Sequence, residues 1–420
     1  FDRDPALYFN LGPARIPYHH TALLGYCKEF GVPLEVIVNE NRAAYFQDDG
    51  AFGGSAVQNR QVINDSRGYL AELLAKAINR NALEQEVSVD EQEKLLAFVS
   101  RFGNLNDDYA YAGSSRSGYR VTPGAATAAG DLAEPLAFSS LLDSAFWRYK
   151  MHFGEGYHQA ATMLQPVGGM DQIAKAFAQQ VGHLITYNAV VSQIRKTPAG
   201  VRVVYTDAAS GEETAVTADF AICTFPLSVL SDIEADFSPA FQDAIASAAD
   251  LYANAIKVAF QARRFWEEDQ NIYGGISWTE ADITQLWYPS GGFHKPQGII
   301  VGAYIWDNPI AEQWEPMTTA ERLARAIADG SKIHPNYAQE ISAPQGCSIA
   351  WGKVPYSQGG WIEWDEETRT TAYRVLTQPD DTIYLAGEHL SYLTGWQEGA
   401  ILSAHEAVRG IANRMQAISA

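Results

Sequence analysis

The chain has 420 residues, 47% of them hydrophobic, so it is long enough to bury more than one sizeable core. Its formal net charge of -20 argues against nucleic acid as a partner, because a polyanion would be repelled. No apolar run approaches the roughly 18 residues of a membrane span. The three cysteines, Cys27, Cys223 and Cys347, are too few and too far apart for a disulfide framework or a CxxC zinc site.

Sequence patterns divide the chain into a helical stretch and a later strand-rich stretch. A helix is predicted over 19–30 and ends before Gly31. Residues 60–165 are predicted to be mainly helical, and one helix starts at the capping-box pattern Ser88 to Glu91. The rest of the chain predicts short strands at 190–194, 201–205, 218–224, 255–261, 299–306 and 382–386. This order favours an α/β (α+β) protein with two interleaved strand-containing domains and a helical insertion.

The C-terminal segment has the pattern of a strand, a loop and a helix that could bind a cofactor. The predicted strand ends at Gly387-Glu388, and Gly395 opens a helix. The predicted apolar face of that helix is Ile401, Ala404, Val408 and Ile411. Unpaired N–H groups in its first turn could hold the anionic N1–C2=O edge of a reduced flavin. Glu388 could accept hydrogen bonds from ribityl or ribose hydroxyls. An ordinary structural strand–loop–helix unit is the alternative.

Four segments carry a more specific signal. They are Asn10-Leu11-Gly12-Pro13-Ala14-Arg15-Ile16-Pro17, Gln165-Pro166-Val167-Gly168-Gly169-Met170-Asp171, Phe265-Trp266-Glu267-Glu268 followed by Tyr273-Gly274-Gly275, and the C-terminal run 386–414. Together they resemble the flavin amine oxidase (monoamine oxidase-like) family, and the first is similar to the motif of its L-amino acid oxidases, bacterial ones included. The resemblance implies FAD as cofactor and a two-domain fold, with a Rossmann-like FAD domain and a mixed-sheet substrate domain.

The domains implied by this resemblance alternate along the chain. Residues 1–55 and 251–375 would form the substrate domain and residues 56–164 the helical domain. Residues 165–250 and 376–420 would belong to the FAD-binding domain.

The first FAD-binding βαβ unit is absent from this sequence. There is no GxGxxG turn to place the pyrophosphate on a helix N-terminus, and the single GxG, at Gly154 to Gly156, follows no predicted strand. Either a second small chain carries this unit, as a fragment of one precursor, or the chain is a truncation that cannot hold FAD. We expect the second chain, and with it a dimer of heterodimers, because an unpartnered sheet edge and helix face would otherwise be exposed.

Arg15 and Tyr304 are the predicted carboxylate-binding residues. A guanidinium offers a planar fork that matches a carboxylate, and the resemblance places at Arg15 the arginine that binds the substrate α-carboxylate in L-amino acid oxidases. Alternation along 299–306 puts Ile300, Gly302 and Tyr304 on one face, where Gly302 would leave room beside Tyr304. The family's second carboxylate ligand is a tyrosine at this position. A surface arginine and a core tyrosine are the alternatives.

Lys257 is predicted to assist the reaction of the reduced flavin with oxygen. Alternation places Ile256, Val258 and Phe260 on one face of the strand and Lys257 on the other. A lysine inside such an apolar strand needs a partner or a function. In the family, a lysine here holds a water against flavin N5 and is linked to reoxidation by oxygen.

The resemblance implies further site residues. The Gly395 carbonyl would accept a bond from the substrate amine, Trp396 and Trp351 would line the pocket, and the Val191 backbone would bond the adenine. The implied cofactor-binding set is Gly12, Pro13, Ala14, Arg15, Val191, Trp351, Gly387, Glu388, Gly395, Trp396, Gln397 and Ala400. His152 and His158 are candidates for a catalytic base by their region of the chain, with a local match that is poor. No metal-ligand spacing appears among the histidines.

The sequence thus predicts oxidation of an L-amino acid by oxygen to a 2-oxo acid, ammonia and hydrogen peroxide. A primary-amine or polyamine oxidase would not need Arg15. An oxygenative decarboxylase would act on the same amino acids, and a non-catalytic subunit would keep the fold without the flavin. The preferred side chain is not encoded in any recognised motif. The N-terminal residues do not form a signal peptide, and a secreted or periplasmic location after processing is left open.

Overall fold

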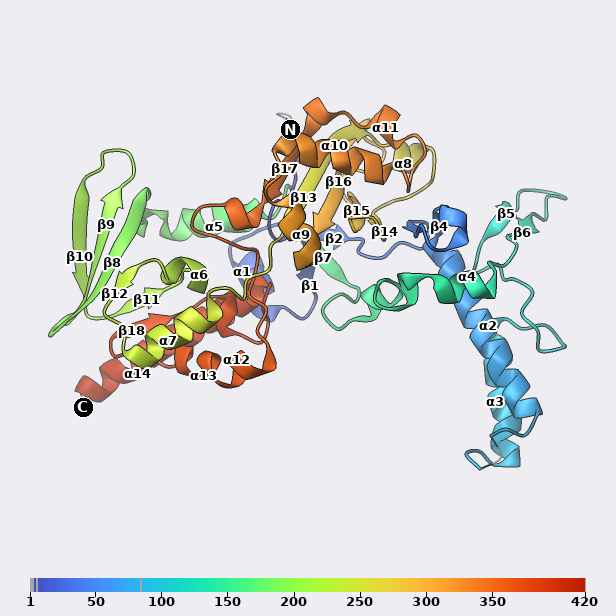
Figure 1. Ribbon diagram of the computed structural model, residues 1–420, viewed down its shortest axis with the longest axis horizontal. Helices are drawn as coiled ribbons and strands as arrows, with labels where there is room; N and C mark the ends of the chain where they lie inside the picture. The colour runs from blue at the N-terminus through green and yellow to red at the C-terminus, as the bar shows by residue number, and fades with distance from the viewer. Residues whose placement is uncertain (1–3, 5–6, 84, 420) are drawn as a thin grey trace.

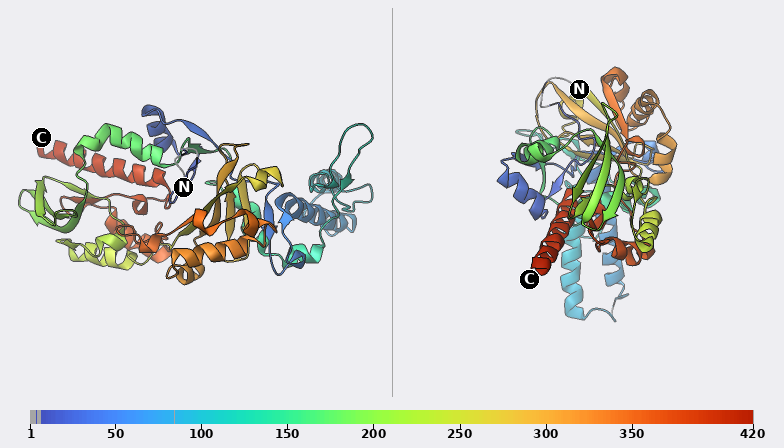
Figure 2. Two further views of the ribbon diagram at one scale, coloured as in Figure 1. Left: turned by 90° about the horizontal axis from the view of Figure 1, so that it is seen from above. Right: turned by 90° about the vertical axis from the view of Figure 1, so that its left-hand side faces the viewer.

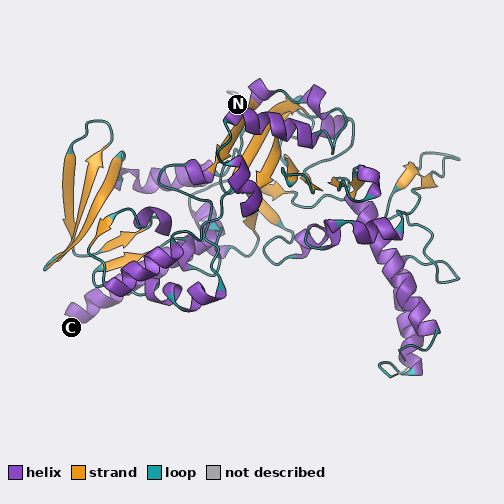
Figure 3. Ribbon diagram, viewed as in Figure 1, coloured by secondary structure: helices purple, strands orange, loops and turns teal. Residues whose placement is uncertain are grey.

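The computed structural model describes residues 4, 7–83 and 85–419, and the first residues of the predicted substrate domain, 1–3 and 5–6, lie outside this range. The molecule is elongated and has three regions (Figures 1 and 2). A mixed sheet lies in the centre, a strand-and-helix region with the C-terminus lies at one end, and a helical arm lies at the other. Figure 3 shows that strands are concentrated in the first two regions.

The central region is a seven-stranded sheet in the order β17-β13-β16-β15-β14-β3-β4. All neighbours are antiparallel except β14 and β3. Its strands are β3 (Tyr45–Gln47), β4 (Val57–Gln58), β13 (Ile256–Arg263), β14 (Gly275–Thr279), β15 (Gln285–Tyr288), β16 (Gln297–Ile305) and β17 (Gly346–Ala350). Helices on one face are α8 (Phe265–Glu268), α9 (Asn308–Trp314), α10 (Thr319–Gly330) and α11 (Tyr337–Glu340).

Between this sheet and its helices lies the largest core cluster, which includes Phe260, Trp266, Trp314 and Tyr337. The predicted alternation in β13 is confirmed, because Ile256, Val258 and Phe260 all face this core.

The strand-and-helix region contains two smaller sheets, and a third, made of β1, β2 and β7, lies beside the central sheet (Figure 1). One has four strands in the order β10-β9-β8-β12, one pairs β11 with β18 in parallel, and one has the order β1-β7-β2. The strands are β1 (Ile16–Pro17), β2 (Leu34–Ile37), β7 (Met163–Pro166), β8 (Ala189–Thr197), β9 (Gly200–Asp207), β10 (Glu213–Ala218), β11 (Ala221–Cys223), β12 (Glu234–Ala235) and β18 (Ile383–Leu385). The helices are α1 (Thr21–Glu29), α5 (Asp171–Val181), α6 (Leu227–Leu230), α7 (Pro239–Ala248), α12 (Glu366–Thr370), α13 (Ala372–Leu376) and α14 (Gln397–Ser419).

Helix α14 begins two residues after Gly395, because Gly395 takes a left-handed φ of 78° that a helix cannot contain. Of its predicted apolar face, Ile401 packs on the core beside α1, and Ala404 and Ile411 pack near Tyr384. Val408 does not follow the prediction, because its side chain is 57% exposed.

The helical arm consists of α2 (Asn59–Asn79), α3 (Val89–Gly103) and α4 (Phe138–Asp143), with the hairpin β5 (Tyr119–Val121) and β6 (Asp131–Leu132). The capping box at Ser88 and Glu91 is confirmed, since each side chain bonds the other residue's backbone N–H. Short 3-10 turns complete the fold: η1 (Phe52–Gly54), η2 (Ala145–Trp147), η3 (Lys150–Glu155), η4 (Gly182–Leu184), η5 (Ala343–Gln345), η6 (Trp351–Lys353) and η7 (Glu388–Leu390).

Within the described residues, no helix has both the length and the apolar character needed to cross a bilayer. The mixture of sheets and packed helices agrees with the predicted fold class. The residue boundaries predicted for the interleaved domains stay a prediction.

The contact of α3 with α2 gives a first testable prediction. A Cβ at Gly103 would lie 2.2 Å from the Cβ of Ala71, whereas a Cβ at Gly25 in α1 would meet nothing within 4 Å. We expect Gly103→Ala to lower the free energy of unfolding by about 1–3 kcal/mol through overpacking. Gly25→Ala should be neutral or stabilising by up to about 1 kcal/mol, because alanine favours a helix. Denaturant unfolding of both variants measures this, and equal effects would contradict the packing of α3 on α2.

Candidate active site

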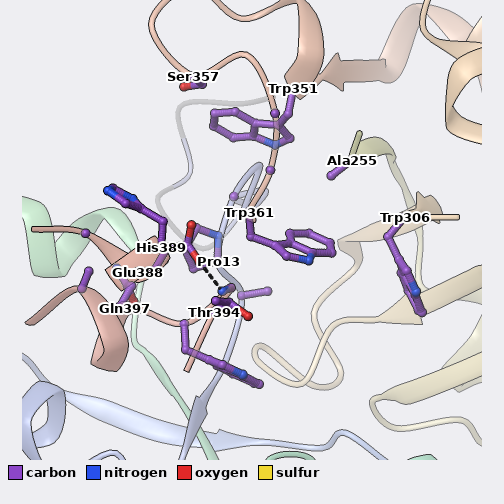
Figure 4. Close-up of a pocket in the computed structure, with 18 of the residues that line it drawn as sticks. Pro13, Ala255, Trp306, Trp351, Ser357, Trp361, Glu388, His389, Thr394 and Gln397 are labelled. Atoms are coloured by element: carbon purple, nitrogen blue, oxygen red, sulfur yellow. Dashed lines mark hydrogen bonds between the residues drawn. The ribbon is translucent and has the colours of Figure 1, made fainter. Parts of the chain in front are cut away.

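A cavity of about 610 Å³ lies where the segment before β1, the central sheet and the β18–α14 connection meet. Trp306, Trp351 and Trp361 project toward it from three different segments (Figure 4). Of the predicted residues, the cavity is lined by Gly12, Pro13, Ala14, Arg15, Lys257, Tyr304, Trp351, Gly387, Glu388, Gly395, Trp396, Gln397 and Ala400. Residues that are far apart in the sequence therefore share one site.

The end of β18 is fixed to α14 by hydrogen bonds. The Gly387 N–H donates to Ser403 Oγ at 2.8 Å, and this hydroxyl lies 2.8 Å from the Gly387 carbonyl. A Cβ on Gly387 would lie 2.2 Å from the His389 ring, so a side chain here would displace that ring. Gly387 is therefore required by close packing.

Glu388 lies inside the cavity wall, and its carboxylate organises the following loop. Its oxygens accept the Gly395 N–H at 2.8 Å and the Ile362 N–H at 3.3 Å; Figure 4 shows this residue among the cavity-lining side chains. Burial raises the pKa of Glu388 to about 7, and the two N–H donors oppose that shift. Each oxygen still has a free lone-pair direction for a hydroxyl donor.

Glu398, which the sequence analysis did not single out, joins α14 to α1. Its carboxylate is buried and accepts the Ala22 N–H at 2.9 Å and the Leu23 N–H at 2.8 Å. These are orphan donors at the N-terminus of α1, and a carboxylate is well placed there. Since α1 follows directly after β1, Glu398 holds the Arg15 segment against the start of α14. A contact between positions 376 residues apart leaves no local sequence signal.

Arg15 is partly buried and ringed by aromatic side chains. Its guanidinium carbon lies 4.7 Å from the ring centre of Trp287, 5.5 Å from that of Phe153 and 5.7 Å from that of Trp396. Its Nε donates to Gln159 Oε1 at 3.0 Å. Burial lowers the pKa of Arg15. Among the described residues no carboxylate forms an ion pair with Arg15, so its two terminal nitrogens can receive an external anion.

Lys257 is buried, with 4% of its surface exposed, and it does have the partner that its position demands. Its Nζ donates to the carbonyl oxygens of Asn10 at 3.1 Å and Gly12 at 2.5 Å. The amine also lies 4.5 Å from the ring centre of Tyr304. Burial, with the nearby positive charge of Arg15 as a second cause, lowers the pKa of Lys257 to about 7.

Tyr304 stands directly opposite Lys257 in the pairing of β16 with β13. The predicted alternation around it is wrong, because a bulge between Val258 and Ala259 shifts the register. Ile300 therefore faces the helix-covered core with Phe260. Gly302 also lies on that side, where its Cβ would be 2.6 Å from the Phe260 ring, so it does not make room beside Tyr304.

Trp351 supports the Arg15 segment from the side opposite Lys257. Its Nε1 donates to the Leu11 carbonyl at 3.0 Å, and a Cβ on Gly12 would be 3.4 Å from its ring. Val191 is not brought to this cavity: it is partly buried in β8 and paired with Tyr205 of β9.

The two candidate bases differ in position. His152 does not line the cavity, so its position gives no support to a catalytic role. It lies in η3 with an exposed side chain, and its Nδ1 is 3.1 Å from Glu155 Oε2. His158 lies nearer, with its ring centre 6.0 Å from that of Trp396, but it does not line the cavity. His20, Tyr149, Phe153 and Gln159 are among the lining residues that were not predicted. Proximity of His20 to the Arg15 motif is the one signal that could have found it.

The comparisons with known proteins add to this geometry. The family model described as flavin containing amine oxidoreductase matches residues 2–412. The chain belongs to this family. It is therefore an oxidoreductase, and its cofactor is FAD.

Among curated relatives of this amine oxidoreductase is the putative L-amino-acid oxidase YobN of Bacillus subtilis (strain 168), which is 27% identical and is matched over 94% of this chain and 82% of the relative. The L-amino-acid oxidase of Bothrops pauloensis is 26% identical over 96% of this chain and 79% of its own.

Solved structures of similar fold include putrescine oxidase bound to putrescine, with a TM-score of 0.61 and 15% identity, covering 96% of this chain and 88% of that one. Cyclohexylamine oxidase from Brevibacterium oxydans IH-35A also has a TM-score of 0.61 and 15% identity, covering 97% and 88%. At this identity the structural likeness concerns the fold alone.

The pKa of Lys257 gives a second prediction. Its value of about 7 is below the ordinary 10.5, so from pH 7 to 10.5 the unfolded chain binds a proton that the folded chain lacks. The free energy of unfolding should therefore rise with pH across this window, relative to a Lys257→Met variant. Melting temperatures of both proteins at pH 7 to 10 measure this, with Lys175→Met, which changes a 60% exposed side chain, as control. The prediction would be contradicted if the difference in melting temperature between the wild type and Lys257→Met did not change with pH.

Proposed function

We propose that this amine oxidoreductase oxidises an L-amino acid. The substrate, oxygen and water would give a 2-oxo acid, ammonia and hydrogen peroxide. The observation that carries the proposal is the position of Arg15, a cation without a carboxylate partner among the described residues, in an aromatic cavity beside Tyr304. An apolar cavity with an unneutralised guanidinium binds a molecule that has both an anionic group and an apolar part.

Three features support a flavin site at this cavity. Gly387 lets the end of β18 approach closely, the Glu388 carboxylate has free lone pairs, and the first turn of α14 has backbone N–H groups at Gln397 and Glu398 without a helical acceptor. The proposed cofactor residues are Gly12, Pro13, Ala14, Arg15, Trp351, Gly387, Glu388, Gly395, Trp396, Gln397 and Ala400, all from the cavity wall. When bound, FAD supplies the acceptor for the two electrons that leave the substrate and their transfer to oxygen.

The chain's own residues would position the substrate. Arg15 would bind the α-carboxylate through its terminal nitrogens while Gln159 holds its Nε, and the Tyr304 hydroxyl would donate to the same carboxylate. The Gly395 carbonyl would accept a bond from the α-amine, and Trp396 would cover the side chain. This fixes the Cα–H in one direction, which is the main contribution that positioning can make.

Charge supports an amino acid over a simple amine. A simple amine has no carboxylate of its own to bond Arg15, and its protonated form would enter a cavity that already contains Arg15 and Lys257. The same two cations would favour loss of the proton from the substrate amine, which must be neutral to be oxidised. Lys257, with a pKa of about 7, can change its protonation state during the reaction with oxygen. Oxygenative decarboxylation of the same substrates would use this geometry too, and it is distinguished by an amide product.

Replacement of Arg15 tests the proposal. We expect Arg15→Met to lower kcat/KM for L-amino acids by about 100-fold or more, because a buried charge-assisted pair is lost. The control is Arg42→Met, which removes an arginine whose side chain is 42% exposed and paired with Glu40. Hydrogen peroxide release with a panel of L-amino acids and amines measures turnover, and flavin absorbance shows that cofactor content is unchanged.

Two results would contradict an L-amino acid oxidase. One is unchanged amino-acid turnover in Arg15→Met. The other is a wild-type enzyme that oxidises amines, but not amino acids, with amine turnover kept in the variant. Absence of flavin absorbance from the purified native assembly would favour a non-catalytic subunit.

We also propose that a second small chain supplies the pyrophosphate-binding βαβ unit. In the described residues β11 and β18 pair only with each other, where a doubly wound sheet needs further parallel strands. Three apolar side chains of the adjacent helix α14 are exposed: Leu402, Val408 and Met415. An additional βαβ unit would extend this sheet and cover α14. Two such pairs would form the complete assembly.

Native mass spectrometry tests the second chain. We expect the 46.1 kDa chain to travel with a small polypeptide that contains GxGxxG and with FAD. Val408→Asp should weaken the complex at least about 10-fold, because it places a charge in an apolar contact. Asn413→Asp adds the same charge elsewhere on α14 and should have no effect. Two results would contradict the proposal. One is a longer single chain that contains the GxGxxG turn, and the other is that Val408→Asp and Asn413→Asp bind the small polypeptide with equal affinity.

A further inference from the structure

Three histidines form a cluster beside the cavity. His19 and His20 immediately precede α1, and His158 lies in the turn after η3. One ring nitrogen from each lies within 4.8 Å of the others. His19 Nε2 is 3.0 Å from His158 Nδ1, and the His20 ring is 4.8 Å from the His19 ring and 6.0 Å from the His158 ring, centre to centre. The short spacings typical of metal ligands in a sequence do not reveal this cluster, because 138 residues separate His20 from His158.

His20 is the unusual member of this cluster. It is 1% exposed, and neither ring nitrogen has a hydrogen-bond partner among the described residues. His19 Nδ1 is also buried without one. Burial of a polar nitrogen without a hydrogen bond is unfavourable, so these nitrogens call for a ligand. Trp396 packs edge-on against the His20 ring, with the two ring centres 5.0 Å apart.

The surroundings of His20 and His158 favour a neutral imidazole, which is the form that binds metals. Burial, with the neighbouring His19 and His158 as further causes, lowers the pKa of His20 to about 4. Burial likewise lowers the pKa of His158. Each neutral imidazole presents a lone pair, so an additional proton or an external cation can be shared among the three.

We propose that His19, His20 and His158 bind one divalent transition-metal ion of the zinc class, with water as the fourth ligand. Three imidazoles and no carboxylate in the cluster select zinc, cobalt, nickel or copper over magnesium and calcium. Tetrahedral zinc with bonds of about 2.0–2.1 Å holds its ligand atoms about 3.3 Å apart. The present separations of up to 4.8 Å therefore need only small ring movements.

The ion would join two segments that build the cavity. His158 adjoins Gln159, whose side chain orients Arg15, and its backbone carbonyl accepts the Asn39 amide at 2.8 Å. His19 and His20 lie on the connection from Arg15 to α1. Metal binding would thus fix the Gln159 segment against the start of α1, while the site itself does not depend on the proposed oxidase activity.

Zinc titration of the purified assembly, stripped with a chelator, tests the site. Calorimetry should give one zinc per chain with a Kd of about 1 µM or lower. His19→Asn and His158→Asn, both at partly exposed positions, should each weaken binding more than about 100-fold, beyond the loss expected for an outer-shell residue. His183→Asn changes an exposed histidine on η4 and is the matched control. Melting temperatures report that each variant is folded.

X-ray absorption at the zinc edge provides a readout besides affinity. Three nitrogen ligands at about 2.0–2.1 Å with imidazole scattering would support the site. The proposal is overturned if zinc binds with a Kd above about 100 µM, or if folded His19→Asn and His158→Asn bind zinc as tightly as His183→Asn. A zinc ion bound by any sulfur, or by fewer than three nitrogen ligands, would also overturn it; one oxygen ligand is expected from the bound water. None of these results bears on whether amino acids are oxidised, so the two proposals fail separately.

Discussion

The buried amine of Lys257 is the contact on which the cavity depends. It bonds the carbonyl oxygens of Asn10 and Gly12, so strand β13 of the central sheet holds the irregular segment that carries Arg15. A buried lysine is tolerated only where such acceptors are present, and those carbonyls would otherwise lack a donor on that side. Trp351 of η6 donates to the Leu11 carbonyl in the same segment, so the segment is bonded to both β13 and η6.

A second buried contact connects this segment to helix α14. Glu398 of α14 caps α1 through two backbone N–H groups, and α1 follows Arg15 within a few residues. The cavity is therefore held by one cation bonded to carbonyls and one anion bonded to amides. The charged groups of Lys257 and Glu398 both bond backbone atoms rather than side chains of opposite charge. Arg15 is left as the cation without a carboxylate partner among the described residues, and this imbalance supports the proposal that the substrate carries an anionic group.

Predictions from local sequence are correct where neighbouring residues alone determine the structure. They fail where strand pairing or the conformation of a loop sets the direction of a side chain. The capping box at Ser88 needs only neighbouring residues, and it forms as predicted. The face of β16 was misassigned because a single bulge opposite Val258 reverses the alternation beyond it. His152 was proposed from its region of the chain, but the conformation of η3 places it in solvent, and no pattern in its neighbours could indicate that direction.

The sequence by itself determined the family and the flavin, and it is the source of the proposal that Arg15 binds a carboxylate, because these depend on motifs whose residues act through local backbone geometry. It also indicated that Lys257 would be buried, since strand alternation fixes its face. Only the tertiary structure decided what Lys257 bonds, that Glu398 joins two helices, and that His19 and His20 meet His158. Each of these is a contact between segments more than 130 residues apart, and such contacts are set by packing of whole elements rather than by the spacing of residues along the chain.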